Sequence, residues 1–516
     1  MMRRRRGGLA GRAALLLAAA SASDAMAAPV VHTPSGALAG VDQGKTHAFL
    51  GILYAQAPIG PLRWKAPQPL LAWHGVRQAT RFGHNCWQAV SPQGFGPWTH
   101  EYVIQGDISE DCLFLNVWAP AHAKGKVPVL VWIHGGGFNS GSGSIPIYDG
   151  RALAPRGIVV VTINYRVGIF GFLAHPDLTR EAAGGPNANF GLQDMIAALR
   201  WVRANIGAFG GDPRAVTIAG QSAGSMAVHE LIASPLAKGL FARAIGESGL
   251  VDPGDAPPLA QAEDAGLAFA REKGAASIAE LRTMPAEALA ASKGGNPVRF
   301  VPILDGVLLP GLHPASRVPT LLGTTADEGS ALGGDYGSSD PAMLQHLLAD
   351  HYGASAARFA PFYPASTDKE RAESNRQVRR DSGAGSIYAW AERRGANPPI
   401  FAYRWAHVEP GPQSDRWLAF HSSEIPYVFQ TLDAAPERGF TAADRLLSQR
   451  ISSYWLNFIR NGDPNGGGLP AWPRFDPANP RILNIGDRIE TRPLLPADRM
   501  AVVRTFVAEG GTPTIF

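Results

Sequence analysis

The stretch Ala215-Val216-Thr217-Ile218-Ala219-Gly220-Gln221-Ser222-Ala223-Gly224 decides the fold of this chain. Its apolar, β-rich first half, followed by Gly-x-Ser-x-Gly, predicts a buried strand that ends in the tight turn called a nucleophile elbow. Side chains at positions 220 and 224 would collide in such a turn, and glycine stands at both. The turn would hold Ser222 in a strained backbone conformation with its hydroxyl exposed as a nucleophile. An ordinary Gly/Ser turn is the alternative interpretation.

Predicted strands and helices alternate on both sides of this segment. Continuous apolar runs at 126–133 and 158–164 are typical of strands buried on both faces of a parallel sheet. Further elements are predicted as strands at 318–325 and 400–406, and as helices at 190–205, 341–350, 368–394 and 443–460, the last before the final loops. This alternation predicts the α/β class, with a large, mostly parallel central sheet flanked by helices. Helical segments at 251–300 are interpreted as a cap or insertion.

The first 27 residues have the three parts of a secretory signal peptide. Arginines at 3–6 form a basic region, AALLLAAA at 13–20 forms a short apolar region, and Ala-Met-Ala at 25–27 forms a cleavage site. The apolar run is too short to span a bilayer comfortably, so cleavage is favoured over a membrane anchor. A twin-arginine signal is the alternative, although the residues after the arginines fit it poorly. We expect export to the periplasm or the medium, with 28–516 as a single domain because no Pro/Gly/Ser linker divides it.

The charge of the chain excludes a basic nucleic-acid-binding surface as its main feature. The formal net charge is +4, and residues 1–27 alone carry five arginines and one aspartate, which also sum to +4. The rest of the chain is therefore close to neutral, which does not favour a nucleic-acid partner. The sequence gives no indication of the oligomeric state.

The chain has two cysteines, Cys86 and Cys112. An exported protein meets an oxidising compartment, so a disulfide is the default expectation, with two buried free thiols as the alternative. In the chain-entropy account, a disulfide closing a loop of this size stabilises the fold by roughly 3–4 kcal/mol.

A nucleophilic serine needs a base and a group that orients the base. Where these residues occur in the chain order serine, acid, histidine, the acid lies in a loop after a strand of the sheet. The predicted strand at 318–325 is followed by two candidate acids, Asp327 and Glu328. His421 lies in a loop, where such a base belongs, and His407 at the end of a predicted strand is the alternative. His346 and His351 fall within or at the end of a predicted helix.

A glycine-rich loop is expected to stabilise negative charge on a substrate oxygen. The strand at 126–133 runs directly into His-Gly-Gly-Gly-Phe at 134–138. Consecutive glycines allow backbone N–H groups to approach an oxyanion without hindrance. A flexible Gly-rich turn is the alternative, but the position between a buried strand and the elbow favours an oxyanion hole.

These motifs and others along the chain resemble the type B carboxylesterases, the family that includes cholinesterases and para-nitrobenzyl esterases. The similar segments run nearly from end to end: GILYA (51–55), PLRW (61–64), WHGVR (73–77), SEDCLFLNVW (109–118), HGGGF (134–138), NYRVG (164–168), FGGDP (209–213), FVPILDG (300–306), YVF (427–429), GDPN (462–465) and WP (472–473). The resemblance implies the α/β-hydrolase fold and hydrolysis of carboxylic esters through an acyl-enzyme intermediate. No metal, dinucleotide or P-loop motif appears in a suitable context, so we expect no cofactor and no metal.

The resemblance also assigns roles that spacing leaves open. It implies that Glu328 is the acid, that His421 is the base and that Ser222 is the nucleophile. It further implies oxyanion donors, a disulfide and a structural ion pair, namely the N–H groups of Gly136, Gly137 and Ala223, the pair Cys86–Cys112, and the pair Arg63–Glu110.

Several positions differ from those of relatives and concern the substrate. Gln221 stands where cholinesterases have glutamate, which removes a negative charge near the expected choline position and disfavours choline esters. Trp98 could stack on a cation, although a wall or core aromatic is the more common role of such a residue. Asn296 and Val298 are smaller than the acyl-pocket phenylalanines of acetyl-specific members, so we expect room for longer acyl groups. Glu247 replaces the usual glutamine and is either a second buried carboxylate near the site or a paired structural residue.

Three functions are therefore considered. The first is a broad-specificity carboxylesterase acting on small-molecule esters. The second is an esterase specialised for aromatic esters of the feruloyl or phthalate type. The third is a non-catalytic, cholinesterase-like binding protein, which the retained serine, glutamate and histidine disfavour.

Overall fold

The computed structural model describes residues 28–123, 125–291, 299–311, 314–395 and 397–515 of the chain. The predicted signal peptide, residues 1–27, lies outside the described residues, and so do Asn296 and Val298.

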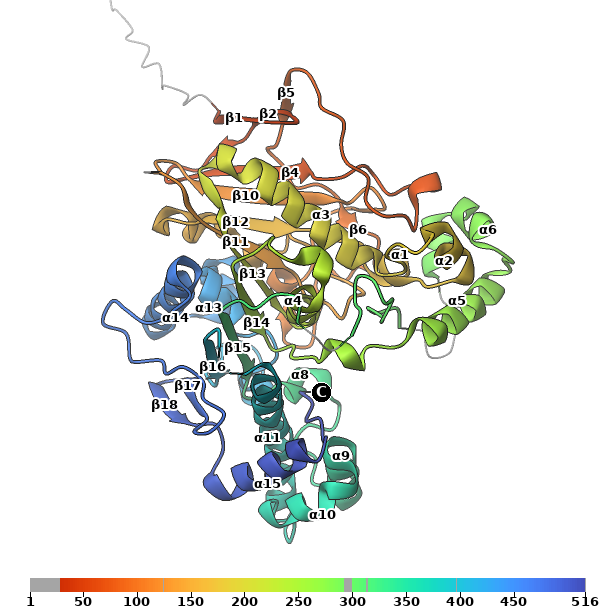
Figure 1. Ribbon diagram of the computed structural model, residues 1–516. Helices are drawn as coiled ribbons and strands as arrows, with labels where there is room; N and C mark the ends of the chain where they lie inside the picture. Colours follow the sequence, from red (N-terminus) through yellow and green to blue (C-terminus); the bar gives the residue numbers. More distant parts are fainter. Residues whose placement is uncertain (1–27, 124, 292–298, 312–313, 396, 516) are drawn as a thin grey trace, which may run out of the picture.

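One large sheet passes through the molecule (Figure 1). In the described residues its strands follow one another in space as β18 (Ile489–Pro493), β17 (Arg481–Ile485), β16 (Ile400–Trp405), β15 (Thr320–Thr325), β14 (Arg243–Glu247), β13 (Gly211–Gln221), β11 (Val127–Ile133), β12 (Val159–Ile163), β10 (Phe114–Pro120), β4 (Thr46–Leu53) and β3 (Val41–Asp42). Strands β12, β11, β13, β14, β15, β16 and β17 pair in parallel, and antiparallel strands complete both edges. The predicted large, mostly parallel sheet is confirmed.

Small sheets lie outside the central one. They are formed by β1 (Val30–Thr33), β2 (Gly36–Ala39) and β5 (Val76–Gln78), by β6 (Asn85–Cys86) and β9 (Ile108–Ser109), and by β7 (Gly94–Phe95) and β8 (Trp98–Thr99). The last four strands belong to the loop between the two cysteines, which they give a fixed shape.

Helices cover both faces of the sheet, because its central strands are apolar on both sides. In β11, Val129 and Val131 pack in one core cluster with helices α3 and α4, and Leu130 and Trp132 pack in another with α13 and α14. Successive side chains of a strand point to opposite faces of the sheet, which explains this alternation. The helices are α1 (Gly168–Phe172), α2 (Pro176–Ala182), α3 (Phe190–Asn205), α4 (Ala223–Ala233), α5 (Leu259–Lys273), α6 (Ile278–Thr283), α7 (Ala286–Ala290), α8 (Gly329–Leu332), α9 (Pro341–Tyr352), α10 (Ala356–Phe359), α11 (Asp368–Arg394), α12 (Ser414–Trp417), α13 (Ile425–Phe429), α14 (Ala442–Asn461) and α15 (Ala497–Ala508).

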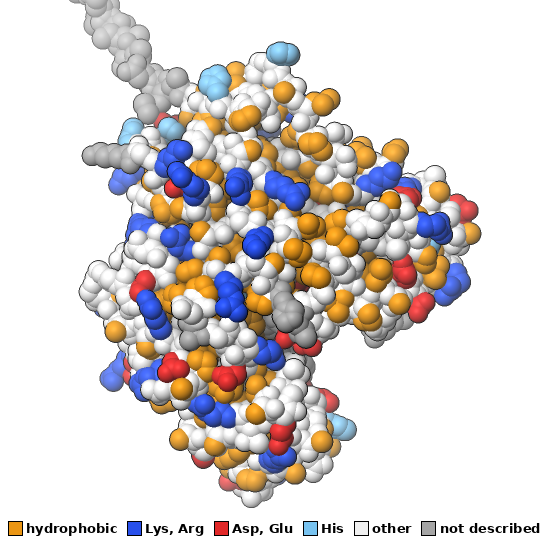
Figure 2. Space-filling view, in the orientation of Figure 1, with side chains coloured by type: hydrophobic (Ala, Val, Ile, Leu, Met, Phe, Trp, Pro, Cys, Tyr) orange, Lys and Arg blue, Asp and Glu red, His pale blue; other side chains and the backbone are white. Residues whose placement is uncertain are grey.

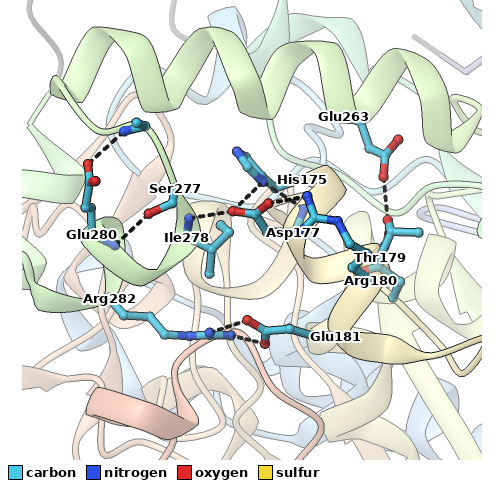
Figure 3. A network of polar contacts seen from close by, with 12 residues as sticks. His175, Asp177, Thr179, Arg180, Glu181, Glu263, Ser277, Ile278, Glu280 and Arg282 are labelled. Carbon is cyan, nitrogen blue, oxygen red and sulfur yellow. Dashed lines mark hydrogen bonds and ion pairs between the residues drawn. The ribbon is translucent and has the colours of Figure 1, made fainter.

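The predicted helical insertion at 251–300 consists of α5, α6 and α7, which pack with α1 and α2 in a core cluster of their own. Polar contacts tie it to α2 (Figure 3). Asp177 accepts a hydrogen bond from the backbone N–H of Ile278 at 3.1 Å, and Arg282 donates two to Glu181 at 2.6 and 2.7 Å. The insertion is thus docked by directed contacts as well as by apolar burial.

The region after α14 was expected to be loops, and that expectation is wrong. It contains β17, β18 and α15. β18 is a polar edge strand with no buried residue, and α15 buries only Met500, Val503 and Phe506. β18 therefore lacks an apolar strand pattern, whereas the apolar run of β17 and the spacing of Met500, Val503 and Phe506 in α15 are signals that the sequence analysis missed.

Charged side chains of both signs lie on the face drawn in Figure 2, in keeping with the nearly neutral chain. The outline of the molecule is hollowed between the lobe around α5 and α6 and the lobe around α9 to α11 (Figures 1 and 2). Within the described residues, no helix has the length and apolar character needed to cross a membrane.

Candidate active site

Ser222 stands between the end of β13 and the first turn of α4. Its backbone angles are φ 58° and ψ −128°, a conformation that side chains rarely adopt. A Cβ on Gly220 would lie 2.5 Å from the backbone of Gly224, and one on Gly224 would lie 2.1 Å from the carbonyl oxygen of Ile133. The steric requirement predicted for the nucleophile elbow is therefore present in the structure.

The neighbouring strand holds the elbow in place. The backbone N–H of Ser222 donates to the carbonyl oxygen of Glu247 at the end of β14, at 2.8 Å. One turn later, the N–H of Met226 returns a hydrogen bond to the carbonyl of Ser222 at 2.9 Å. The strained residue is thus bonded on both sides, which is what a rare backbone conformation needs in order to persist.

His421 and Glu328 come together from loops that follow different strands. Nδ1 of His421 lies 2.5 Å from Oε2 of Glu328, and both side chains are buried. The other carboxylate oxygen of Glu328 accepts a hydrogen bond from the N–H of Thr325 at 2.7 Å. One oxygen of the Glu328 carboxylate is thus hydrogen-bonded to the backbone, and the other is hydrogen-bonded to the imidazole.

The alternatives to these two residues have other partners. Asp327 accepts hydrogen bonds from Arg380 at 2.6 Å and from the hydroxyl of Tyr336 at 2.5 Å. His407 lies 2.8 Å from a carboxylate oxygen of Asp444, in α14. Neither alternative pairs with Glu328 or with His421.

The second nitrogen of His421 faces the side chain of Gln221. The two Nε2 atoms are 3.1 Å apart, and Gln221 is buried. An amide nitrogen only donates hydrogen bonds, so this contact suits the imidazole tautomer with its proton on Nδ1, toward Glu328. Among the residues that the structure describes, none makes a hydrogen bond to the hydroxyl of Ser222. Such catalytic contacts often tighten only when substrate is bound.

Backbone N–H groups are arranged beside Ser222. In the 134–138 loop, Gly136 and Gly137 have φ values of 105° and 62°, which glycine adopts without strain. The third group is the N–H of Ala223, the first residue of α4. No described residue accepts a hydrogen bond from these three N–H groups, so all three are available to a substrate oxygen.

The start of this loop is fixed by a buried aromatic stack. The ring of His134 stacks on Tyr165 with centroids 4.2 Å apart, and the Tyr165 hydroxyl donates to the carbonyl of His134 at 2.9 Å. Burial lowers the pKa of His134 to about 4, so this imidazole is neutral at neutral pH. It anchors the loop and does not supply charge to the site.

Comparison with known proteins agrees with this geometry. A family model described as the carboxylesterase family matches residues 27–502. The chain belongs to the carboxylesterase family. A PNB esterase of known structure superposes with a TM-score of 0.79 and 33% sequence identity, covering 92% of this chain and 99% of that one. The predicted α/β-hydrolase fold is confirmed.

Individual relatives of this carboxylesterase align over most of its length. Fumonisin B1 esterase of Sphingopyxis macrogoltabida is 37% identical over 491 residues, which cover 89% of this chain and 87% of that protein. Para-nitrobenzyl esterase of Bacillus subtilis (strain 168) is 36% identical over 476 residues, covering 86% and 92%. Carboxylesterase 5A of Felis catus is 35% identical over 482 residues, covering 83% and 84%.

The disulfide loop of this carboxylesterase reaches the candidate site. Cys86 and Cys112 form a disulfide, as expected. Trp98 in β8, inside the loop they close, donates from Nε1 to the carbonyl oxygen of His421 at 3.1 Å. Its ring packs edge-on against the imidazole, with centroids 6.4 Å apart. Trp98 thus contacts His421, the predicted base, a contact that the position of Trp98 in the sequence did not predict.

The expected ion pair between Arg63 and Glu110 is present, with N–O distances of 2.5 and 2.6 Å. The remaining guanidinium nitrogen of Arg63 donates to the carbonyl oxygens of Leu281, Arg282 and Met284 at the end of α6. This one side chain therefore joins the disulfide loop to the helical insertion, and Glu110 belongs to the scaffold.

Two further carboxyl groups are buried behind the elbow. Glu247 is fully buried and accepts a hydrogen bond from Nε1 of Trp455 at 2.7 Å. Burial raises the pKa of Glu247 to about 8. Burial also raises the pKa of Glu424, and the nearby Glu247 and Glu328 add to this shift. The sequence analysis singled out Glu247 as a departure from the family, whereas it gave no role to Glu424, which lies three residues after His421.

The acyl-pocket residues named from the sequence, Asn296 and Val298, lie outside the described residues. The next described residue, Arg299, lies beside the glycine loop: a Cβ on Gly137 would be 3.7 Å from its Nη2. Arg299 is exposed, and no described carboxylate pairs with it. A cation beside Gly137 is a feature that the sequence analysis missed, because Arg299 belongs to none of the motifs that it used.

Proposed function

We propose that this carboxylesterase hydrolyses esters through an acyl-enzyme on Ser222, with His421 as the general base and Glu328 as the group that orients it. The observation that carries the proposal is the pair of His421 and Glu328, joined at 2.5 Å, beside a serine held at φ 58°. A hydroxyl in that strained turn and an imidazole fixed by a carboxylate have the chemistry of acyl transfer.

The reaction then proceeds in two halves. His421 takes the hydroxyl proton through Nε2 as the oxygen of Ser222 attacks the ester carbonyl carbon. His421 gives this proton to the leaving alcohol as the tetrahedral intermediate collapses, which leaves the acyl group on Ser222. Water attacks the acyl-enzyme with the same base, releasing the carboxylic acid and the free serine. Glu328 stabilises the imidazolium formed in each half.

The three free N–H groups serve the negatively charged oxygen. Gly136, Gly137 and Ala223 would donate to the carbonyl oxygen as it gains charge in the tetrahedral intermediate. Loss of one such donor typically costs about 3 kcal/mol of transition-state stabilisation. These donors are backbone groups, so no point mutation removes one of them cleanly.

For the substrate, we propose broad specificity toward uncharged esters with an acyl group longer than acetyl. Relatives of similar identity are named for different esters, fumonisin B1 and para-nitrobenzyl esters among them, so overall similarity selects no single substrate. The neutral Gln221 beside His421 supplies no negative charge for a choline group. Choline esters are therefore expected to be poorer substrates than uncharged esters of the same acyl length.

The direct test compares Ser222→Ala with Ser225→Ala. Ser225 lies in the same helix and is bonded to the carbonyl of Gly249, so its variant controls for the loss of a hydroxyl close to the site. With para-nitrophenyl butyrate, Ser222→Ala should fold normally and lose activity to background, while Ser225→Ala should keep most of it. Turnover of Ser222→Ala close to that of the wild type would refute the proposed nucleophile.

The same assay defines the substrate class. Para-nitrophenyl esters from acetyl to dodecanoyl report the acyl length, and feruloyl and phthalate esters report the specialised alternative. Activity confined to acetyl esters would contradict the proposed acyl preference, and activity confined to aromatic esters would favour the specialised enzyme. If no ester is hydrolysed, labelling of Ser222 by an organophosphate is measured by mass spectrometry. A labelled serine means that the site is active and the esters were unsuitable, whereas an unlabelled serine means that the site is inactive.

We also propose that the protein is exported and that residues 1–27 are removed. The Ala-Met-Ala sequence at 25–27 and the disulfide support this, because disulfides persist in oxidising compartments. The N-terminal sequence of the protein purified from periplasm and from medium tests the proposal. We expect a mature chain that begins at position 28, whereas an intact N-terminus in the cytoplasm would contradict export.

A further inference from the structure

Three side chains with metal-binding atoms meet outside the proposed active site. His100 and Glu101 lie in the short 3-10 helix His100–Tyr102, two residues after Trp98, and Glu437 lies in the 3-10 helix Pro436–Arg438. Their ligand atoms all lie within 4.8 Å of one another. The Nδ1 atom of His100 is 3.5 Å from Oε2 of Glu101 and 3.4 Å from Oε1 of Glu437.

These distances suit one kind of metal ion. A tetrahedral zinc ion with ligands at about 2.0–2.2 Å separates its ligand atoms by about 3.3–3.5 Å. Both distances from His100 match that edge of the tetrahedron. One imidazole with two carboxylates is a donor set that zinc accepts, whereas calcium and magnesium prefer oxygen ligands alone.

The hydrogen-bond pattern of the Glu101 carboxylate is a second and independent indication of a cation. Glu101 is 2% exposed, and its Oε1 accepts hydrogen bonds from Thr99 at 2.8 Å and from Nε of Arg438 at 2.6 Å. Its other oxygen, Oε2, faces His100 and is buried with no hydrogen-bond partner among the described residues. A buried carboxylate oxygen without a partner is costly, and a bound cation removes that cost.

We propose that His100, Glu101 and Glu437 form a zinc site whose fourth position is open to water. Thr99 and Arg438 orient the carboxylate from behind, as outer partners do in metal sites. Zinc would join the disulfide loop at residue 100 to the separate segment at 436–438. Because Trp98 in the same loop is bonded to the carbonyl of His421, the site would steady the loop that supports the base.

The test uses the mature protein without a histidine tag, freed of metal by a chelator and dialysed. Calorimetric titration with zinc chloride should give one tight site per chain. His100→Gln and Glu437→Gln should each weaken that affinity at least about tenfold. These side chains are 45% and 55% exposed, so both variants should fold. His74→Gln, at an exposed histidine outside the cluster, is the matched control and should bind zinc as the wild type does.

Thermal unfolding gives a readout independent of esterase activity. Zinc at about 100 times its Kd should raise the midpoint by about 2–3 °C in the wild type and in His74→Gln, and much less in the two site variants. Absence of tight zinc binding, or equal binding by His100→Gln and the wild type, would overturn the proposal. In those cases the three residues form an ion-paired cluster only. Binding of calcium in preference to zinc would also overturn it.

Discussion

The side-chain nitrogen of Gln221 lies 3.1 Å from Nε2 of His421, the atom that receives the serine proton in the proposed mechanism. The residue before the nucleophile therefore contacts the base directly. As a neutral donor it favours the unprotonated form of that nitrogen. A carboxylate in the same place would favour the protonated form, which cannot act as a base.

Gln221→Glu is accordingly expected to move the acidic limb of the kcat/KM pH profile upward by about 1–2 pH units, because a negative charge 3 Å from the base stabilises its cation. The measurement is the rate with para-nitrophenyl butyrate between pH 5 and 9. Gln221→Met, similar in size and uncharged, removes the donor without adding charge and should move the limb upward by much less than Gln221→Glu does. An unchanged limb in Gln221→Glu would mean that the contact does not exist in solution.

Arg299 predicts a preference among acyl groups. Its guanidinium lies beside Gly137, pairs with no carboxylate among the described residues, and would attract an ester whose acyl chain ends in a second carboxylate. For Arg299→Gln we expect kcat/KM for a hemisuccinate ester to fall by up to about fivefold relative to the butyrate ester of the same alcohol, a difference that added salt reduces. Arg271→Gln, at an exposed arginine of α5, is the matched control. Equal loss on both esters would point to a structural role for Arg299 instead.

The fold and the tight turn at Ser222 could be predicted because their signals are local. Buried parallel strands are continuous apolar runs, and the crowding around Ser222 forces glycine at 220 and 224. Position alone could not separate Asp327 from Glu328, because both follow β15. They differ in where their side chains end: Asp327 turns to Arg380, and Glu328 turns to His421. The family resemblance implies Glu328, and Glu328 is the one of the two that lies against His421 in the structure.

The remaining contacts of the base depend on packing between distant segments. Gln221 is 200 positions from His421 along the chain, and Trp98 is 323 positions from it. No pattern in a single sequence shows that these two distant segments pack against the imidazole of His421. For the same reason the cluster of His100, Glu101 and Glu437 carries no recognisable metal motif, since its parts are joined only in the folded chain.

The disulfide should contribute substantially to stability and to the placement of Trp98. Cys86 and Cys112 are 26 positions apart, and closing a loop of this size stabilises a fold by roughly 3–4 kcal/mol. The double variant Cys86→Ser/Cys112→Ser should lose about that much in urea unfolding. A reductant should bring the wild type to the level of the variant and leave the variant unchanged. Equal stability of the reduced and oxidised wild type would contradict this contribution.

Glu247 predicts a pH dependence of stability whose sign can be worked out. Burial raises the pKa of Glu247 to about 8 in the folded protein, from 4.5 for an ordinary glutamate. Between these values the folded chain holds a proton that the unfolded chain has released, so stability falls as the pH rises from 4.5 toward 8. Glutamine has the same shape, stays neutral and can still accept the hydrogen bond from Trp455.

We therefore expect Glu247→Gln to match the wild type near pH 5 and to be more stable by about 1–3 kcal/mol at pH 8. Urea unfolding at pH 5, 6.5 and 8 measures the difference. Glu287→Gln, at an exposed glutamate of α7, is the matched control and should follow the wild type at every pH. Parallel curves for Glu247→Gln and the wild type would show that Glu247 is already ionised at pH 5, with Trp455 and its surroundings stabilising a buried charge. A difference that grows with pH would show that the protein carries this carboxyl in its neutral form, as the glutamine of its relatives would be.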